Sequence, residues 1–367
     1  MTATQRVLLD APSLGESEKR YLCRSISSGF VSTVGPFVPR FERKMAALLD
    51  VSDAVAVQSG TASLHIALLE LGIGKGDEVI VPALTFIAAV NPVLYVGARP
   101  VFVDAAIDTW NIDPDAISRR ITSRTKAILP VHLYGNPCNM DRIRHLARRH
   151  GIAIIEDATE GLGARFRGRY LGTLGTLGCY SFNGNKIITT GGGGMVVGHR
   201  RRQLSHVRFM INQARLGRET FSHPEVGYNY RMTNIEAALG LSQLGRLQAF
   251  LRKKKKFHDI YRQELSGSPV AFQGMYPHSE SSWWFTAIML EDRLTASRLE
   301  RRLADKDIPV RRVFPPVTEQ PPYLEYRQGT YPCAKAIYDR GLCLPCSVCN
   351  TEKQIADVAK KIRTILG

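Results

Sequence analysis

The chain has 367 residues, enough for two lobes around a large core, because single domains usually hold about 100–200 residues. Apolar residues make up 44% of the chain and charged residues 22%, as in ordinary globular proteins. The first ten residues lack the apolar run of an export signal, and no stretch approaches the roughly 18–20 apolar residues of a membrane span. We therefore expect a soluble, cytoplasmic protein with no membrane partner.

The formal net charge is +16, and part of it lies in the clusters Arg200–Arg202 and Lys253–Lys256. Such a balance suits nucleic acid, but it also attracts anionic small substrates such as nucleotide diphosphates. Lys253–Lys256 falls within a long amphipathic helical pattern, where solvated lysines are the simpler interpretation. The sequence has neither a separate helix-turn-helix segment nor a basic patch interleaved with aromatic residues. We therefore expect no nucleic-acid partner.

The first half of the chain alternates apolar strands with helices. Asp113 and Pro114 open one of these helices, with Asp113 as the N-cap and Pro114 in the first turn. Because βαβ repeats with nearly continuous apolar strands are typical of parallel sheets, we predict an α/β fold: a mostly parallel central sheet with helices on both faces. The expected strands are 54–58, 77–84, 100–103, 126–133 and 152–158, and the other expected helices cover 61–72, 88–95 and 140–150.

The second half starts with two further strands and a long helical region. From about residue 269 the pattern changes to a separate set of strands and helices. We predict a large domain of residues 1–250, N-terminal arm included, and a small C-terminal α/β domain of residues 251–367. The expected strands are 179–182, 194–198, 281–290 and 308–314, and the expected helices cover 234–265, 294–306 and 351–366.

Three of the seven cysteines, Cys343, Cys346 and Cys349, have the spacing of a metal or iron–sulfur clip. A structural zinc site needs four placed ligands, and only Cys333 or the distant Cys138 could complete this set. We therefore interpret the cysteines as free thiols in a reducing compartment and expect no metal.

Two segments carry residues suited to pyridoxal phosphate (PLP). Asp157 ends the apolar strand 152–158, at the sheet edge where ligands bind, and a PLP pyridinium nitrogen needs such a carboxylate. A helix N-cap explains Asp157 equally well. Lys186 lies in a polar loop before the glycines 191–194, which allow close approach of the backbone to a ligand. A Schiff base needs a partly desolvated lysine of this kind, although a lone lysine near glycines is usually a surface residue.

A third segment, Ser59-Gly60-Thr61-Ala62-Ser63, forms a strand-to-helix turn. Backbone N–H groups at a helix N-terminus suit a phosphate, and the hydroxyls add donors, although ordinary N-capping explains the motif as well. Together the three segments could hold a phosphate, protonate a ring and form an imine, all at the carboxyl edge of one sheet.

These motifs make the sequence recognisable. It resembles the sugar-nucleotide aminotransferases of the DegT/DnrJ type, within the aspartate aminotransferase superfamily of PLP fold type I. The resemblance covers almost the whole chain, in segments 35–42, 59–68, 76–93, 130–141, 155–164, 181–197, 227–244 and 342–345.

The resemblance implies a role for each site residue. Lys186 would be the Schiff-base lysine and proton shuttle, Asp157 would pair with the pyridinium nitrogen, and Glu160 would lie near the phenolic oxygen of the ring. Phe86 would stack on the ring, with core packing as its alternative. Asn229 would reach the phosphate from the partner subunit, which implies a homodimer with shared active sites; a polar turn is its alternative. The expected phosphate-binding residues are Gly60, Thr61 and Ser181, and Asn183 is a further candidate for cofactor binding.

Departures from most relatives narrow the expected substrate. Gly192 replaces a common Glu, and Glu160 stands where many relatives carry Gln or His. Residues 182–190 together with Glu160 resemble the branch that aminates C4 of UDP-linked 4-keto-6-deoxy-N-acetyl sugars. Some relatives carry His in place of the lysine and are dehydratases, which the presence of Lys186 argues against.

We therefore predict transamination from L-glutamate to a nucleotide-linked 4-keto-6-deoxy sugar, with UDP-N-acetyl sugars first and GDP- or dTDP-linked sugars as alternatives. Arg231, Arg311 and Arg312 are candidates for binding the diphosphate. Two other classes stay open: a non-catalytic PLP-binding regulatory protein, and an aminotransferase for cyclitols or an aromatic precursor. The sequence leaves the keto position, the stereochemistry and the polysaccharide or antibiotic pathway undecided.

Overall fold

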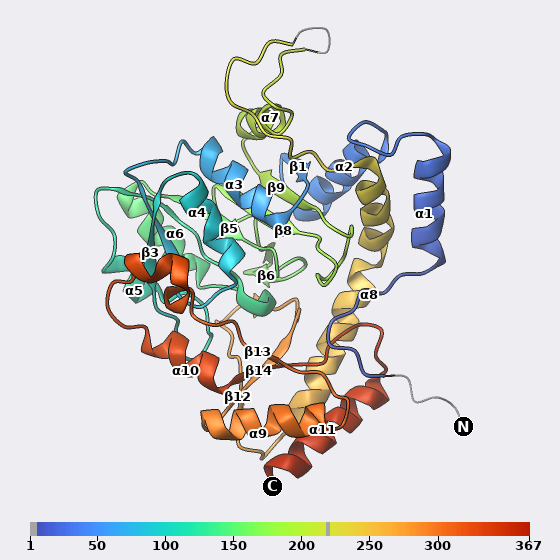
Figure 1. Cartoon of the computed structure of the whole chain (residues 1–367), viewed down its shortest axis with the longest axis vertical. Coiled ribbons are helices and arrows are strands. Elements are labelled where there is room, and N and C mark those ends of the chain that lie inside the picture. Colours follow the sequence, from blue (N-terminus) through green and yellow to red (C-terminus); the bar gives the residue numbers. More distant parts are fainter. Residues whose placement is uncertain (1–5, 218–220) are drawn as a thin grey trace.

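A seven-stranded sheet forms the centre of the larger lobe (Figure 1). The computed structural model describes residues 6–217 and 221–367. The strand order is β1-β9-β8-β5-β4-β2-β3, and the five strands from β8 to β3 run parallel, whereas β9 is antiparallel to both neighbours. The predicted mostly parallel α/β fold is therefore confirmed. The strands are β1 (Asp53–Val57), β2 (Glu78–Pro82), β3 (Arg99–Val103), β4 (Thr125–Ile128), β5 (Ala153–Asp157), β8 (Leu177–Ser181) and β9 (Gly194–Gly198).

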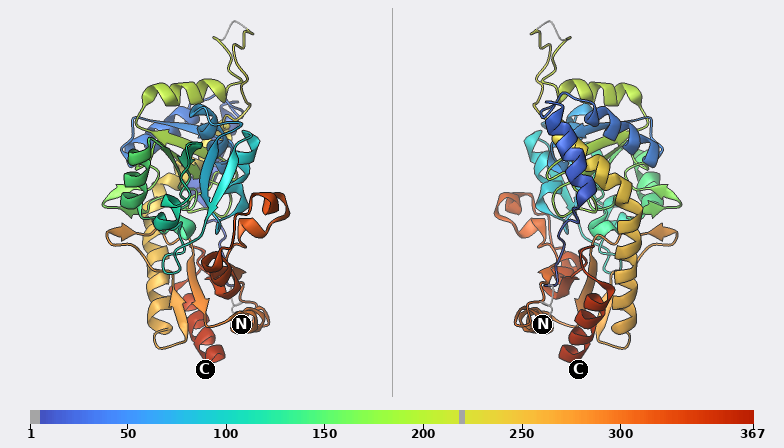
Figure 2. Two further views of the ribbon diagram at one scale, coloured as in Figure 1. Left: turned by 90° about the vertical axis from the view of Figure 1, so that its left-hand side faces the viewer. Right: turned by 90° about the vertical axis from the view of Figure 1, so that its right-hand side faces the viewer.

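Helices cover both faces of this sheet (Figure 2). Local sequence fixes their ends: in α6 the Asn139 side chain accepts a hydrogen bond from the Arg142 N–H, and Gly151 ends the helix in the left-handed conformation. The helix predicted at 88–95 is divided, because Pro92 begins a new helix after a short 3-10 turn. The elements are α1 (Glu16–Ser27), α2 (Phe37–Leu49), α3 (Gly60–Glu70), η1 (Ile87–Ala89), α4 (Asn91–Tyr95), α5 (Pro114–Ser118), η2 (Leu133–Gly135), α6 (Met140–His150) and α7 (Arg201–Met210).

A smaller lobe follows the long helix α8 (Asn234–Glu264), which begins with a capping box between Thr233 and Glu236. Its antiparallel sheet has the order β10-β12-β14-β13 and shares an apolar core with α8, α9 and α11. The domain boundary at residue 250 stays a prediction, because α8 runs across it without a break. The elements are β10 (Val270–Phe272), β12 (Thr286–Leu290), α9 (Arg293–Ala304), β13 (Arg311–Arg312), η3 (Val317–Glu319), η4 (Pro321–Tyr326), α10 (Pro332–Arg340), β14 (Gly341–Leu344) and α11 (Glu352–Leu366).

Some sequence expectations were wrong in detail. The strand predicted at 281–290 begins only at Thr286, because residues 281–285 turn their polar and aromatic groups toward the larger lobe: Ser282 donates to the carbonyl of Glu160, and Trp284 to that of Asn185. The strand predicted at 308–314 is reduced to β13. A small sheet of β6 (Arg165–Phe166), β7 (Arg169–Tyr170) and β11 (Ser279–Glu280) was not foreseen, since its strands are too short to form a pattern.

The lysine cluster on α8 also needs a correction. Lys255 and Lys256 are exposed, but the Lys254 side chain is only 3% exposed, so the interpretation as solvated lysines fails at this position. The Lys254 ammonium donates to the carbonyls of Trp284 (3.0 Å) and Cys346 (3.1 Å). Buried lysines need such partners, because a desolvated charge without them is very costly.

An N-terminal strap, residues 7–13, connects the two lobes. It lies along the loop 346–350 and α8, and α1 then packs beside α8 (Figure 1). Leu8 exchanges two hydrogen bonds with Asn350, and the carbonyl of Leu9 accepts from the N–H of Cys346. At its end, the carbonyl of Ser13 accepts from Arg246. These bonds tie Leu8 and Leu9 to the small lobe and Ser13 to α8.

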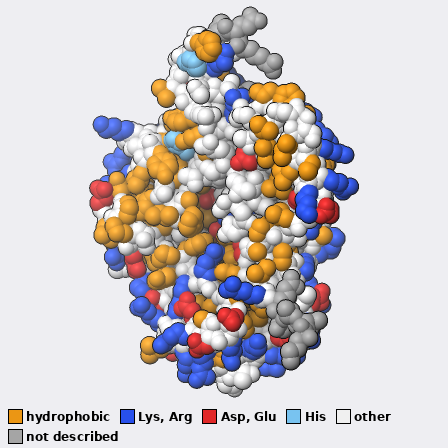
Figure 3. All heavy atoms as spheres, turned by 45° about the vertical axis from the view of Figure 1, so that its right-hand side comes forward, with side chains coloured by type: hydrophobic (Ala, Val, Ile, Leu, Met, Phe, Trp, Pro, Cys, Tyr) orange, Lys and Arg blue, Asp and Glu red, His pale blue; other side chains and the backbone are white. Residues whose placement is uncertain are grey.

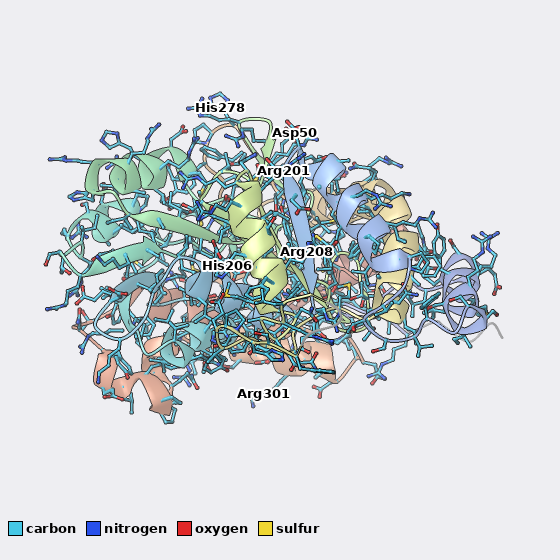
Figure 4. All side chains as sticks on the ribbon, turned by 90° about the horizontal axis from the view of Figure 1, so that it is seen from above. Asp50, Arg201, His206, Arg208, His278 and Arg301 are labelled. Carbon is cyan, nitrogen blue, oxygen red and sulfur yellow. The ribbon has the colours of Figure 1, made fainter. Side chains whose placement is uncertain are left out.

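The segment between α7 and α8 projects from the top of the molecule in Figure 1. At its base His206, which Figure 4 shows on α7, lies between Glu70 (2.6 Å) and Glu225 (2.9 Å). Two apolar side chains on the projection, Phe221 and Val226, are 85% and 79% exposed. On the face drawn in Figure 3, apolar side chains gather over the upper half, whereas lysines and arginines line the lower edge.

Two further findings concern metal binding and membrane association. All seven cysteines lie in the described part of the chain and are free thiols, and the residues described there hold no group of three metal-ligating side chains. Among residues 6–217 and 221–367, no helix combines the length and apolar character needed to cross a bilayer. The cytoplasmic location stays a prediction.

Candidate active site

A cavity of about 350 Å³ lies at the carboxyl ends of β5 and β8, between the two lobes. Parallel strands place their following loops at one edge, so residues far apart in sequence meet there. Eight of the nine predicted site residues line the cavity: Gly60, Thr61, Phe86, Asp157, Glu160, Ser181, Asn183 and Lys186. The ninth, Asn229, does not.

The N-terminus of α3 forms one wall of the cavity. Ser59 caps the helix by accepting a hydrogen bond from the N–H of Ala62 (3.0 Å), so the capping alternative holds for this hydroxyl. A Cβ on Gly60 would lie 2.8 Å from the Cβ of Ser181, and a Cβ on Gly194 would lie 2.3 Å from the carbonyl oxygen of Ser59. Glycine at both positions lets the helix start pack directly against β8 and β9, with its first N–H groups at the cavity.

Asp157 occupies the floor of the cavity at the end of β5. It is 3% exposed, and it accepts a hydrogen bond from the N–H of Thr159 (3.0 Å). No helix starts after it, so the N-cap alternative does not apply. Its neighbour Glu156 points to the opposite side of the strand, where it binds backbone N–H groups of Gly172 and Leu174. Burial raises the pKa of Asp157, although the nearby Lys186 works against this rise.

Glu160 and Lys186 face each other across the cavity floor, with Nζ and Oε1 3.9 Å apart. Glu160 is 4% exposed and accepts a hydrogen bond from the N–H of Tyr134 (2.7 Å), a residue in the left-handed conformation (φ 58°). Burial raises the pKa of Glu160 to about 7 and lowers the pKa of Lys186. A lowered pKa increases the share of neutral amine, which is the form that acts as a nucleophile and a base.

Thirteen residues that line the cavity were not among the predicted cofactor-binding residues, and four of them add polar or aromatic groups that bear on its chemistry. Thr85 follows β2, while Trp284, Arg311 and Phe314 come from the small lobe. The indole of Trp284 lies with its centroid 4.0 Å from Nζ of Lys186. The Nε and Nη2 atoms of Arg311 have no hydrogen-bond partner among the described residues. The paired tryptophans at 283–284 and the paired arginines at 311–312 stand out in the sequence. Nothing in the sequence indicates that they lie beside Lys186 in the fold.

The three arginines proposed for a diphosphate separate in the structure. Arg311 lines the cavity. Arg312 points away and binds Glu300, Ser297 and the carbonyl of Asp339 within the small lobe. Arg231 does not line the cavity, although its backbone pairs with Val57 near the start of α3.

The structure bears on the alternative interpretations of Phe86 and Asn229, which were core packing and a polar turn. Phe86 is 53% exposed at the cavity wall, 5.4 Å from the ring of Phe314, so core packing does not explain it. Asn229 is exposed on the segment that leads down from the projection, and it pairs with Asn212 through the backbone. It therefore contributes nothing to the cavity of its own chain.

Residues 12–363 match the DegT/DnrJ/EryC1/StrS aminotransferase family. The chain belongs to this family. It is 39% identical to the GDP-perosamine synthase of Escherichia coli O157:H7, covering 96% of both chains, and 39% identical to that of Caulobacter vibrioides, covering 100% of both. Among solved structures, it is similar to the PLP form of the putative sugar aminotransferase Spr1654 from Streptococcus pneumoniae, with TM-score 0.94, 25% identity and 98% of each chain covered.

Another similar structure is DesV of S. venezuelae, with TM-score 0.88, 33% identity, and 94% of this chain and 93% of that chain covered. The predicted family, fold type I and aminotransferase activity are thus confirmed, and the cofactor is PLP. The cavity fits this cofactor: a lysine amine of lowered pKa, a buried carboxylate and the start of a helix meet in one space.

The raised pKa of Glu160 gives a stability prediction. The folded protein binds a proton on Glu160 near pH 7, whereas the unfolded chain does so near pH 4.5. Protonation therefore stabilises the fold at low pH, and this contribution is lost as the pH rises through 7. Between pH 6 and pH 8 we expect cofactor-free wild type to lose about 1 kcal/mol of unfolding free energy that Glu160→Gln does not lose, measured by denaturant unfolding. Equal losses in both proteins would contradict the assignment.

Proposed function

We propose that the protein transfers an amino group from L-glutamate to the C4 keto group of a nucleotide-linked 4-keto-6-deoxy sugar. The observation that carries the proposal is the amine of Lys186, which lies 3.9 Å from Glu160 in the cavity that Asp157 also lines, and whose pKa is lowered by burial. An amine so placed can form the covalent link to PLP and afterwards accept and return a proton.

The relatives favour a GDP-linked sugar. Three of the curated relatives, at 37–39% identity, are named GDP-perosamine synthase, which gives the UDP-N-acetyl sugars expected from the sequence no support. A non-catalytic PLP-binding protein is disfavoured because Lys186, Asp157 and Glu160 are all in place around one cavity. We infer that a GDP-linked 4-keto-6-deoxy sugar is the acceptor to test first, with UDP- and dTDP-linked sugars beside it.

The residues that line the cavity have separate tasks in this reaction. When bound, PLP supplies a sink for the electron pair left as a proton leaves the substrate carbon. Asp157 holds a positive charge at the floor of the cavity, and the N–H groups at the start of α3 hold a phosphate. Nζ of Lys186 takes the α-proton of glutamate and, in the second half, returns a proton to C4 of the sugar. Trp284 and Phe314 exclude water from this amine.

The lysine assignment is tested by absorption spectroscopy of the purified protein with added PLP. Wild type should show a band of lysine-linked cofactor that changes to the amine-carrying form on addition of glutamate. Lys186→Ala should show neither, because Lys186 is the only lysine that lines the cavity in the described part of the chain. Lys255→Ala, which changes an exposed lysine, serves as the control and should behave as wild type. A lysine-dependent band that persists in Lys186→Ala would overturn the assignment.

The adjacent arginines provide a matched test of anion binding. We infer that Arg311 binds an anionic group of a substrate, since its guanidinium lines the cavity with unpaired nitrogens, whereas Arg312 binds the small lobe. Arg311→Gln should raise KM for the sugar nucleotide at least tenfold, the loss of about one charge-assisted hydrogen bond. Arg312→Gln should lower Tm and leave KM within twofold. An unchanged KM in Arg311→Gln would exclude Arg311 from the diphosphate site.

We also infer a homodimer in which Asn229 completes the cavity of the partner. Asn229 is exposed and lies outside its own cavity, on a segment whose exposed apolar side chains need a cover. In Asn229→Asp the new carboxylate would repel the cofactor phosphate. Mixing inactive Lys186→Ala with weakly active Asn229→Asp should therefore restore about a quarter of wild-type activity, because half of the dimers regain one intact site. No restoration after subunit exchange would contradict shared sites.

A further inference from the structure

Trp284 lies between Lys186 and a second buried lysine. Its ring faces Nζ of Lys186, 4.0 Å from the centroid, and its carbonyl accepts a hydrogen bond from Nζ of Lys254 (3.0 Å). The indole is 2% exposed, and its Nε1 donates to the carbonyl of Asn185, next to Lys186 in the chain (2.7 Å). Trp284 is therefore held through both its indole and its backbone carbonyl, with the ring face beside the reactive amine.

The ring face matters because two features of the surroundings of Lys186 disfavour a charged amine. Burial favours the neutral form, and the Arg311 guanidinium adds a like charge. The carboxylates that oppose this are Glu160 and Asp157 on the floor and Asp10 of the strap. An aromatic face attracts an ammonium, most strongly when the face is that of tryptophan and the site is dry.

Lys254 holds Trp284 from behind. Its ammonium is buried and bonds the carbonyls of Trp284 and Cys346, and Oδ1 of Asp10 lies 3.6 Å away. The thiol of Cys346 donates to the same Trp284 carbonyl (3.0 Å). Lys254 thereby ties α8, the loop after β14 and the N-terminal strap to the backbone that carries the indole. Asp10 is its counter-charge, without which the buried ammonium would be unpaired.

We propose that the indole face of Trp284 stabilises the ammonium form of Lys186, and that Lys254, with Asp10 as its counter-ion, is the positioning residue that keeps the indole there. The meaning of this contact for catalysis depends on the proposed function, in which Lys186 is released as a free amine that must hold a proton and pass it on. Trp284 sets how firmly that proton is held, opposing the burial that would otherwise remove it too early.

The proton affinity of Lys186 can be measured without cofactor. Labelling of the cofactor-free protein with acetic anhydride over a range of pH, read by mass spectrometry of the Lys186 peptide, gives the pKa of that amine. Trp284→Leu should lower this pKa by about one unit, and Trp284→Phe, which keeps a weaker aromatic face, should lower it less. Trp283→Leu is the matched control, since Trp283 stacks on His258 at 3.6 Å and should leave the Lys186 pKa unchanged.

Substitution of Lys254 gives a second test, in which the direction of the change in the Lys186 pKa decides between two roles. If Lys254 acted only as a charge, Lys254→Met would remove a cation and raise the pKa of Lys186. If it holds Trp284, the same substitution lowers that pKa, and the lowering disappears when Trp284 is already Leu. Lys255→Met, which removes an exposed lysine from the same helix, should change nothing.

An unchanged Lys186 pKa in both Trp284 variants would overturn the proposal for the indole, and a raised pKa in Lys254→Met would overturn the role of Lys254. Trp284→Phe keeps the test decisive if the leucine variant does not fold. Failure of the proposed function is seen separately: wild type would then show no lysine-linked cofactor band with PLP and no change on addition of glutamate, whatever the labelling gives.

Discussion

The structure around the cavity depends on keeping one lysine amine out of water. Nζ of Lys186 lies 3.9 Å from Glu160 and 4.0 Å from the centroid of Trp284, in a pocket whose burial lowers its pKa. A buried amine without partners would be costly, and one with too many would hold its proton permanently. The balance of carboxylates, aromatic face and desolvation holds the pKa of the amine below its ordinary value, which makes its proton easier to exchange.

Both lobes are needed for this balance. The larger lobe supplies Lys186, Asp157 and Glu160 from loops at one sheet edge, while the smaller lobe supplies the aromatic wall and Arg311. Beside that wall, Ser282 and Trp284 of the smaller lobe donate hydrogen bonds to the carbonyls of Glu160 and Asn185 in the larger lobe. The relative position of the lobes is therefore fixed by buried polar contacts close to the reactive amine, where a small shift changes its surroundings.

Several residues at the proposed phosphate site also have a structural role. Ser59 caps α3, and in doing so it fixes the helix start whose free N–H groups face the cavity. Gly60 and Gly194 permit contacts that any Cβ would block, and the same contacts bring β8 and β9 against that helix start. N-capping and the proposed phosphate binding are therefore compatible, because the cap orients the remaining N–H donors.

The sequence by itself determined the parallel α/β fold and the positions of Gly60, Thr61, Asp157 and Lys186, because apolar strands and their following loops are local patterns that a sheet brings to one edge. The family and the other four predicted cavity residues came from the resemblance of whole sequence segments to known aminotransferases. It did not determine that Lys254 is buried or that Trp284 and Arg311 face Lys186, since these depend on how the small lobe docks. Docking depends on buried hydrogen bonds between segments 30 to 99 residues apart, and such contacts leave no periodic pattern in the sequence.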